Sequence, residues 1–243
     1  MPTPPKDPWL SILLPTRGRP AQAMRLLTSL LATASDPSGI EVLLYIDEDD
    51  PDSLGIALSG LRVERHRGPA GMGLGVMTNV LYQASSAPYI MLCGDDNVFR
   101  TTGWDDMVRA EFARFPDDVA LVYGDDLFQG EQICTAPFVS RTACELMGGP
   151  CPVVYKGSYI DTHLLSVFVH LEHQGHKRRV YLPNLIIEHL HHLAGKADLD
   201  ATYANRPMSG EESQALFLAL EPMRTRQINS LARHIRDFAR RAA

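Results

Sequence analysis

Two adjacent aspartates, Asp95 and Asp96, are the residues whose type and position most clearly suggest chemistry. They follow a short apolar run, Tyr89-Ile-Met-Leu, at the point where a strand would end. Carboxylate oxygens are the ligands that Mg²⁺ and Mn²⁺ prefer, and such ions neutralise the charge of a diphosphate. Because aspartate also favours turns, this motif alone leaves a metal site and a simple polar turn equally open.

Apolar runs and helical stripes alternate along the first half of the chain. Strands are expected at residues 10–14, 40–46, 61–65, 89–92 and 119–123, and helices after Pro20 and at 52–58, 76–84 and 104–115. This alternation predicts an α/β fold, with a mostly parallel central sheet covered by helices on both faces.

Ligands bind beyond the carboxyl ends of the strands in sheets of this kind. Several polar groups come directly after an expected strand: Thr16-Arg17, Asp47, Asp95-Asp96 and Asp125-Asp126. We therefore expect them along one edge of the sheet. Asp125-Asp126 is interpreted first as a polar turn, with a contact to an acceptor as the alternative, and Trp104 is expected to pack within its helix.

The composition is that of a globular protein with one main domain: 243 residues, 45% hydrophobic and 21% charged. No apolar stretch approaches the roughly 20 residues needed to span a bilayer. The Pro-rich start lacks the features of a secretory signal, so we expect a cytoplasmic protein. The four cysteines have no Cys-x-x-Cys spacing, which favours buried or idle thiols over a disulfide framework or a zinc ribbon.

The C-terminal segment is basic although the net charge of the chain is -6. Residues 223–243 hold six arginines and one acid, Asp237, while Ile228, Leu231, Ile235 and Phe238 recur at helical spacing. The pattern predicts an amphipathic helix that docks by its apolar face and leaves its arginines in solvent. A nucleic-acid contact is the alternative interpretation.

Three familiar nucleotide or hydrolase signatures are absent from the sequence. The glycine run 68–75 has Val76 where the dinucleotide-binding fingerprint needs its last glycine. Neither a phosphate-binding P-loop nor a Gly-x-Ser-x-Gly elbow occurs. The glycines are expected to form a tight turn or to allow a close approach of the backbone.

Taken together, several segments resemble the nucleotide-binding half of glycosyltransferases with the GT-A fold, family-2-like, and a branch encoded by bacterial viruses. They are Ser11-Ile-Leu-Leu-Pro-Thr-Arg-Gly-Arg-Pro, the strand ending in Asp47, the Gly-rich stretch leading to Asn79, and 89–97. The late segment 183–192, followed by 195–198 and Tyr203, extends the similarity to residues 9–203.

The resemblance implies a GT-A-like, Rossmann-like sheet with a C-terminal helical extension. It divides the chain into a tail (1–8), a catalytic domain (9–205) and a helical extension (206–243). The catalytic domain would comprise a nucleotide-sugar half (9–130) and an acceptor and metal-histidine half (131–205).

The resemblance also assigns roles to single residues. Those that would contact the nucleotide sugar are Pro15, Thr16, Arg17, Asp47, Arg67, Asn79 and Asp95. Asp47 would bind the base, and Arg67 or Asn79 would lie near ribose or phosphate. The metal would be held by Asp95 and Asp96 with His189 or His191, which share a face if the segment is extended. Family-2-like enzymes often have two acids flanking one residue, and one register puts Cys93 at the first acid. Because imidazole suits zinc better than magnesium, a zinc site stays open.

The family also implies a catalytic base. Inverting members use a carboxylate at the start of a helix, and Asp161 precedes an expected helix at residues 162–171. Many members have Glu-Asp where this chain has Ile160-Asp161, and an aspartate at a helix start is also a common N-cap. Arg67 or Lys196 would stabilise charge on the leaving group.

The sequence thus predicts a glycosyltransferase that depends on Mn²⁺ or Mg²⁺. It would move a sugar from a nucleotide diphosphate sugar, UDP-sugar favoured, to a hydroxyl with inversion. A hydroxymethylated base in viral DNA, modified in the host cytoplasm, is one acceptor hypothesis. The alternatives are a sugar-nucleotide nucleotidyltransferase and a non-catalytic nucleotide-sugar binding protein. No membrane partner is expected, and oligomeric state and donor sugar stay open.

Overall fold

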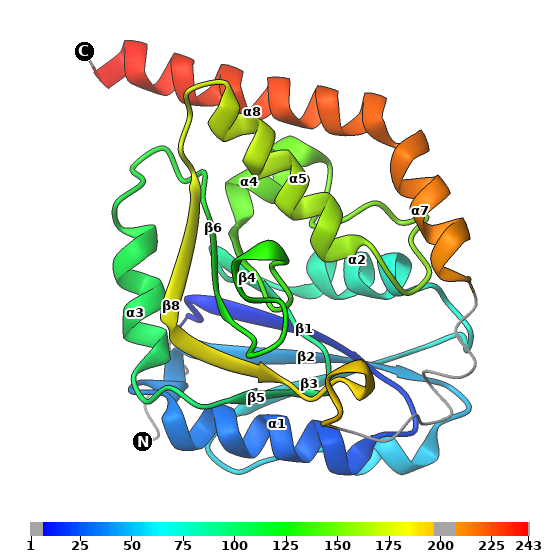
Figure 1. The fold of residues 1–243 in the computed structure, drawn as a ribbon. Coiled ribbons are helices and arrows are strands. Elements are labelled where there is room, and N and C mark those ends of the chain that lie inside the picture. Colours follow the sequence, from blue (N-terminus) through cyan, green and yellow to red (C-terminus); the bar gives the residue numbers. More distant parts are fainter. Residues whose placement is uncertain (1–6, 197–207, 243) are drawn as a thin grey trace.

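A computed structural model describes residues 7–196 and 208–242. Within them, eight strands form one sheet in the order β3-β2-β1-β4-β7-β6-β8-β5 (Figure 1). The strands are β1 (Leu10–Thr16), β2 (Ile40–Asp47), β3 (Arg62–Gly68), β4 (Tyr89–Leu92), β5 (Asn97–Phe99), β6 (Leu121–Asp125), β7 (Phe138–Ser140) and β8 (Arg179–His189). Helices lie on both faces, so the α/β class is confirmed.

The sheet is parallel on its first side and mixed on its second. β1, β2, β3 and β4 pair in parallel, as does β6 with β8. β7 is antiparallel to both β4 and β6, and β5 is antiparallel to β8. The five strands expected from the sequence are present with small shifts in their ends. β5 and β7 were not expected, because strands of three residues carry no periodic pattern. Most of the longer β8 was not expected either.

The helices are α1 (Pro20–Thr33), α2 (Leu74–Ala84), α3 (Trp104–Phe112), α4 (Arg141–Met147), α5 (Ile160–His173), α7 (Gly210–Ala219) and α8 (Glu221–Ala242). The expected helix at 52–58 is instead a 3₁₀ turn, η2 (Pro51–Gly55). The Asp50 side chain accepts from the backbone of Ser53 and tightens this turn. Helix α3 ends three residues earlier than expected.

The side chains of β1 point alternately to the two faces of the sheet, and each face has its own hydrophobic core. Ile12 and Leu14 point to the face covered by α1 and α3, whereas Leu13 points to the face covered by α2, α4 and α5. Trp104 belongs to the first core, where it is fully buried and its ring lies 4.6 Å from that of Phe99. The prediction that Trp104 packs within the protein is therefore confirmed.

The C-terminal helices cover the second core from outside (Figure 1). A capping box of Ser209 and Glu212 begins α7. In α8, Ile228, Leu231 and Ile235 are buried beside α4 and α5. The predicted docking by an apolar face is thus confirmed, with one difference: Arg224 is buried and stacks over the Phe217 ring at 3.8 Å. No helix within the described residues is both long and apolar enough to cross a membrane.

Candidate active site

Asp95 lies at the carboxyl edge of the parallel strands and is almost fully buried. Its Oδ2 accepts a hydrogen bond from Thr16 Oγ1 at 2.8 Å, and its Oδ1 accepts one from Arg19 Nη1 at 3.1 Å. Burial raises the pKa of Asp95 to about 6. The positive charge of Arg19 opposes this shift but does not cancel it. The motif that contains Thr16 also contains Arg19, but the sequence did not single out this arginine as the counter-ion of an aspartate.

Asp96 faces a histidine from the far end of the chain. The antiparallel pairing of Asn97 with His189 joins β5 to β8, and Leu190 N donates to Asp96 O at 2.9 Å. The Asp96 Oδ2 and His189 Nε2 atoms lie 3.3 Å apart. The backbone pairing therefore brings together a carboxylate and an imidazole that are distant in sequence.

Asp126 lies on the other side of the His189 ring. Its Oδ2 is 3.9 Å from His189 Nδ1, which is too long for a hydrogen bond. Burial opposes ionisation, but hydrogen bonds from Thr135 and from the backbone of residues 128–130 outweigh it and lower the pKa of Asp126. Asp126 does form the polar turn that the sequence suggested, and it also lies beside the histidine.

His191 is buried next to His189, with ring centroids 4.9 Å apart. Its ring stacks with Phe128 at 5.8 Å. Its Nδ1 accepts a hydrogen bond from Leu193 N at 3.2 Å, so in the neutral ring the proton is on Nε2. His191 therefore presents a donor, not a free lone pair, on its other nitrogen.

Arg17 and Asp47 meet where β1 and β2 end. The Arg17 guanidinium binds Asp47 and forms a two-bond pair with Asp49 at 2.6 and 2.7 Å. These bonds raise the pKa of Arg17. Asp47 Oδ1 is buried and accepts no hydrogen bond from the described part of the chain. It is an acceptor that a ligand could satisfy. Asp50, which directly follows Asp49, accepts a hydrogen bond from Gly18 N at 2.7 Å.

The other residues expected to contact the donor have varied surroundings. Pro15 is part-exposed near the end of β1. Arg67 Nη2 donates to Glu48 O at 3.0 Å, next to the end of β2. Lys196 Nζ pairs with Glu188 Oε1 at 2.9 Å. The remaining residues of that late motif, 197, 198 and 203, lie outside the described residues.

Asn79 connects the Gly-rich segment to the loop before α5. Its side-chain amide donates to Gly75 O at 2.7 Å and to Cys151 O at 2.8 Å. Gly75 N also donates to Tyr155 O at 2.8 Å, and a Cβ on Gly75 would lie 2.4 Å from Pro152 O. The close approach expected of these glycines is therefore an approach to the protein's own backbone at Gly75.

Asp161 lies in the first turn of α5, after the cap position, which is Tyr159 with a φ of 71°. Its Oδ1 accepts from Thr162 N at 2.7 Å. Burial raises the pKa of Asp161, and the Thr162 hydrogen bonds and the positive charge of a protonated His189 oppose that shift. Asp161 thus lies within electrostatic reach of the histidine site and is not the N-cap of its helix.

The donor set at this edge can be tested against a divalent ion. Within residues 7–196 and 208–242, no three or more carboxylate, imidazole or thiol side chains converge as a complete cage. Asp96 and His189 present two ligand atoms, which is what an ion bound mainly to phosphate oxygens and water requires. Burial raises the pKa of the Cys93 thiol well above its usual value, which leaves it a poor ligand. All four cysteines are free and buried, as expected.

Comparisons with known proteins show the fold. No family model matches the chain, and no curated protein does. Among solved structures, S. aureus TarS 1-349 in complex with UDP has a TM-score of 0.59 at 13% identity, over 96% of this chain and 92% of that one. A mannosyltransferase from Pyrobaculum calidifontis in complex with GDP-Man and Mn²⁺ has a TM-score of 0.58 at 12% identity, over 98% and 77%. The chain has a GT-A-like fold. In the match to a longer TarS chain, the aligned part is 73% of this chain but only 36% of the TarS chain, so this chain spans about a third of that protein's length.

Proposed function

We propose that the protein transfers a sugar from a nucleotide diphosphate sugar to an acceptor hydroxyl, with a divalent metal and with inversion. The convergence of Asp96 and His189 beside Asp95, at the carboxyl edge of a GT-A-like sheet, is the observation that carries this proposal. The structural neighbours support a nucleotide-sugar donor, because they were solved with UDP, UDP-GlcNAc or GDP-Man.

The donor side of the site would comprise Thr16, Arg17, Asp47 and Asp95. The unsatisfied Asp47 Oδ1 suits a base with a ring N–H donor, such as uracil or guanine, because a buried acceptor without a partner is costly. Adenine and cytosine present an acceptor at the equivalent ring position. This supports a UDP-sugar or a GDP-sugar over donors that carry adenine or cytosine; we retain the UDP-sugar as the first choice and the GDP-sugar as the alternative.

Asp96 and His189 would hold the metal. His189 is favoured over His191, since the Nδ1 of His191 is already an acceptor and its Nε2 therefore carries a proton. A bound Mn²⁺ or Mg²⁺ would neutralise the charge that develops on the departing diphosphate. Asp126 supports this assignment because its negative charge, 3.9 Å from His189 Nδ1, favours the proton on Nδ1 and so leaves Nε2 as the ligand atom.

Asp161 would be the catalytic base. Its raised pKa follows from burial, which makes the carboxylate a stronger proton acceptor than an exposed aspartate. As the acceptor oxygen forms its bond to the anomeric carbon, the bond from that carbon to the diphosphate oxygen breaks, and Asp161 takes the hydroxyl proton. Attack from the face opposite the leaving group inverts the anomeric centre.

For the acceptor we retain the hydroxyl of a hydroxymethylated base in DNA. The exposed arginines of α8 support an acceptor that carries phosphate groups. The family-2-like and viral relationships, and the division of the chain near residues 130 and 205, likewise remain proposals that the motifs support. The second boundary lies outside the described residues.

The test begins with Mn²⁺ and a panel of nucleotide sugars, first alone and then with plain and hydroxymethylated DNA. Release of nucleoside diphosphate with sugar incorporation is expected, whereas release of pyrophosphate would indicate a nucleotidyltransferase. Donor binding without turnover on any acceptor would indicate a binding protein. Asp96→Asn should abolish the Mn²⁺ dependence of donor binding, while the exposed Asp106→Asn on α3 is the matched control.

A further inference from the structure

The outward face of α8 carries a stripe of four exposed arginines, Arg226, Arg233, Arg236 and Arg240. Their spacing of seven, three and four residues places them on one side of the helix, opposite the buried Ile228, Leu231 and Ile235. The stripe spans 14 residues, which is about 21 Å of helix. It is therefore a straight array of charges on a firmly docked element.

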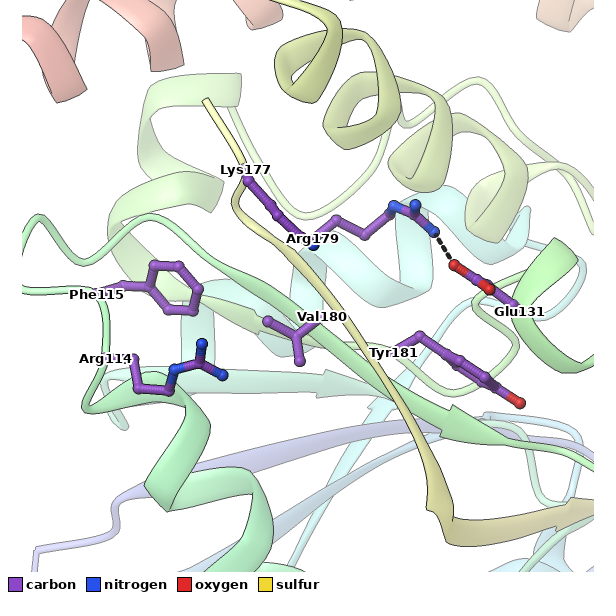
Figure 2. A pocket seen from close by; sticks show the side chains of 7 residues that line it. All are labelled: Arg114, Phe115, Glu131, Lys177, Arg179, Val180 and Tyr181. Atoms are coloured by element: carbon purple, nitrogen blue, oxygen red, sulfur yellow. Dashed lines mark hydrogen bonds and ion pairs between the residues drawn. The ribbon is translucent and has the colours of Figure 1, made fainter. Parts of the chain in front are cut away.

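A second group of basic side chains lies at a cleft near the start of β8. The cleft has a volume of about 380 Å³, and Arg114, Lys177 and Arg179 line it together with Phe115 and Tyr181 (Figure 2). Arg179 turns toward Glu131, with which it pairs at 3.0 Å. Arg114 and Lys177 are exposed at the rim, where Arg114 pairs with Glu111 and Lys177 adds a positive charge.

The stripe and the cleft are held together by contacts around Asp117. The Asp117 carboxylate binds Arg178 at 2.6 Å, and the Asp117 carbonyl meets His234 of α8 at 2.9 Å. His176 lies in the turn before β8, where burial and then the positive charges of Arg236 and Arg178 lower its pKa. Figure 1 shows the same turn rising to α8. We call the four α8 arginines together with Arg114 and Lys177 the basic band.

Most of the basic band is uncompensated. Within the described residues, no ion pair joins Arg226, Arg233, Arg236 or Lys177 to a carboxylate. The chain as a whole is negative, with a net charge of -6. A local concentration of unpaired cations on such a protein suits an anionic partner, because steering by charge is set by the local field.

We propose that the basic band binds duplex DNA through its phosphates. Duplex DNA carries one charge per about 1.7 Å of its axis when both strands are counted, so a length of about 21 Å carries roughly a dozen phosphates on its two strands. A row of guanidinium groups on a docked helix suits such a row of charges. A membrane surface is disfavoured because the apolar face of α8 is buried and its outward face offers no large apolar side chain to insert. The aromatic Phe115 is covered by Arg178, which disfavours an apolar protein interface.

The binding test uses the full-length protein, a labelled 20-base-pair duplex and fluorescence anisotropy at 50–200 mM NaCl, with EDTA and no donor. Six phosphate contacts would give a slope of log K against log[salt] near about -5. Arg233→Gln with Arg236→Gln should reduce the steepness of this slope by about 2 and weaken binding. Arg25→Gln with Arg65→Gln changes the charge equally on exposed arginines elsewhere and should leave binding near wild type.

Equal DNA binding by the Arg233/Arg236 variant and wild type would overturn the proposal, as would vesicles of phosphatidylglycerol that bind as tightly as DNA. The role of the band in presenting an acceptor rests on the proposed transfer, but the binding itself does not. The two are separable, because the Arg233/Arg236 variant should keep Mn²⁺-dependent donor binding while Asp96→Asn should keep DNA binding and lose the donor.

Discussion

The two sides of the candidate site are built from different kinds of chain segment. On the nucleotide side, Thr16 and Asp47 end β1 and β2, and Asp95 follows the neighbouring parallel strand β4. Arg17 and Arg19 pair with the two aspartates. On the acceptor side, the acids and the histidine come from segments that are far apart in sequence. His189 Nδ1 there is buried without a hydrogen bond from the described residues. The first side is held together by arginine–carboxylate pairs and keeps one unsatisfied acceptor, Asp47 Oδ1, whereas the second side is brought together by long-range backbone pairing.

The proposed chemistry requires that the acceptor side carry most of the catalytic effect. Asp161→Asn keeps the size of the side chain but removes the proton acceptor, so kcat for transfer should fall about 10²- to 10⁴-fold. Donor affinity, measured by titration of Mn²⁺ and UDP-sugar, should stay unchanged, because Asp161 does not lie on the nucleotide side.

Thr162→Val is the control for Asp161→Asn, since it removes only the hydroxyl that lies 3.3 Å from the carboxylate. Its kcat should stay close to that of wild type. A variant Asp161→Asn that retains full kcat, or loses donor binding and kcat together, would contradict the division between the two sides.

The nucleotide side should respond mainly through stability. Arg19→Met leaves the buried Asp95 carboxylate without its counter-ion, and breaking a buried pair in this way costs about 3–5 kcal/mol of unfolding free energy. Arg240→Met is the matched control, because Arg240 and its partner Asp237 are both exposed and an exposed pair contributes about 1 kcal/mol or less. Urea denaturation at pH 7 measures both.

A second variant tests whether the loss comes from the unpaired charge. Adding Asp95→Asn to Arg19→Met removes that charge and should recover much of the lost stability, although donor binding should fail. Equal destabilisation by the single and the double variant would show that packing around Arg19, and not its charge, holds this side together.

The same contrast explains what the sequence could predict. The nucleotide side was predictable because buried parallel strands are continuous apolar runs, and each polar group directly follows one. Asp161, His189 and Asp126 were recognisable as residues, but the approach of His189 to Asp96 and Asp126 depends on the pairing of Asn97 with His189. Short strands such as β5 have no period, and long-range register leaves no local signal in the sequence.

The acceptor side also depends on α8 through a buried histidine. His163, on α5 two residues after Asp161, has its Nδ1 3.0 Å from Tyr155 Oη and its Nε2 2.9 Å from Gln227 Oε1. The Gln227 amide donates to Met147 O at 3.0 Å, so Oε1 accepts and the proton of His163 is on Nε2. Burial lowers the pKa of His163 to about 4.

This histidine should make stability depend on pH. Because its folded pKa is depressed, the unfolded chain binds more protons between pH 6.5 and about 4, so stability rises with pH in that window. The contribution is present above pH 6.5 and is lost as pH falls, by up to about 3 kcal/mol. Urea denaturation across this window should show a shallower pH dependence for His163→Gln than for wild type. The exposed His170→Gln on the same helix is the control. Identical slopes for His163→Gln and wild type would exclude this histidine as the source.

The smallest expected effect concerns the carboxylate behind the proposed metal ligand. Asp126→Asn keeps an oxygen for the backbone N–H groups of residues 128–130 but removes the negative charge 3.9 Å from His189 Nδ1. If that charge orients and polarises the ring, the Mn²⁺ concentration needed for half-maximal donor binding should rise about 10- to 100-fold.

Thr135→Val separates charge from local structure in this last comparison. It removes the 2.7 Å hydrogen bond to Asp126 Oδ2 and leaves the carboxylate in place. Metal affinity should therefore change little, while the turn loses about 1 kcal/mol of stability. If Thr135→Val weakens Mn²⁺-dependent donor binding as much as Asp126→Asn does, the effect comes from the shape of the turn. In that case metal affinity would depend on Asp96 and the His189 imidazole, with no contribution from the charge behind the ring.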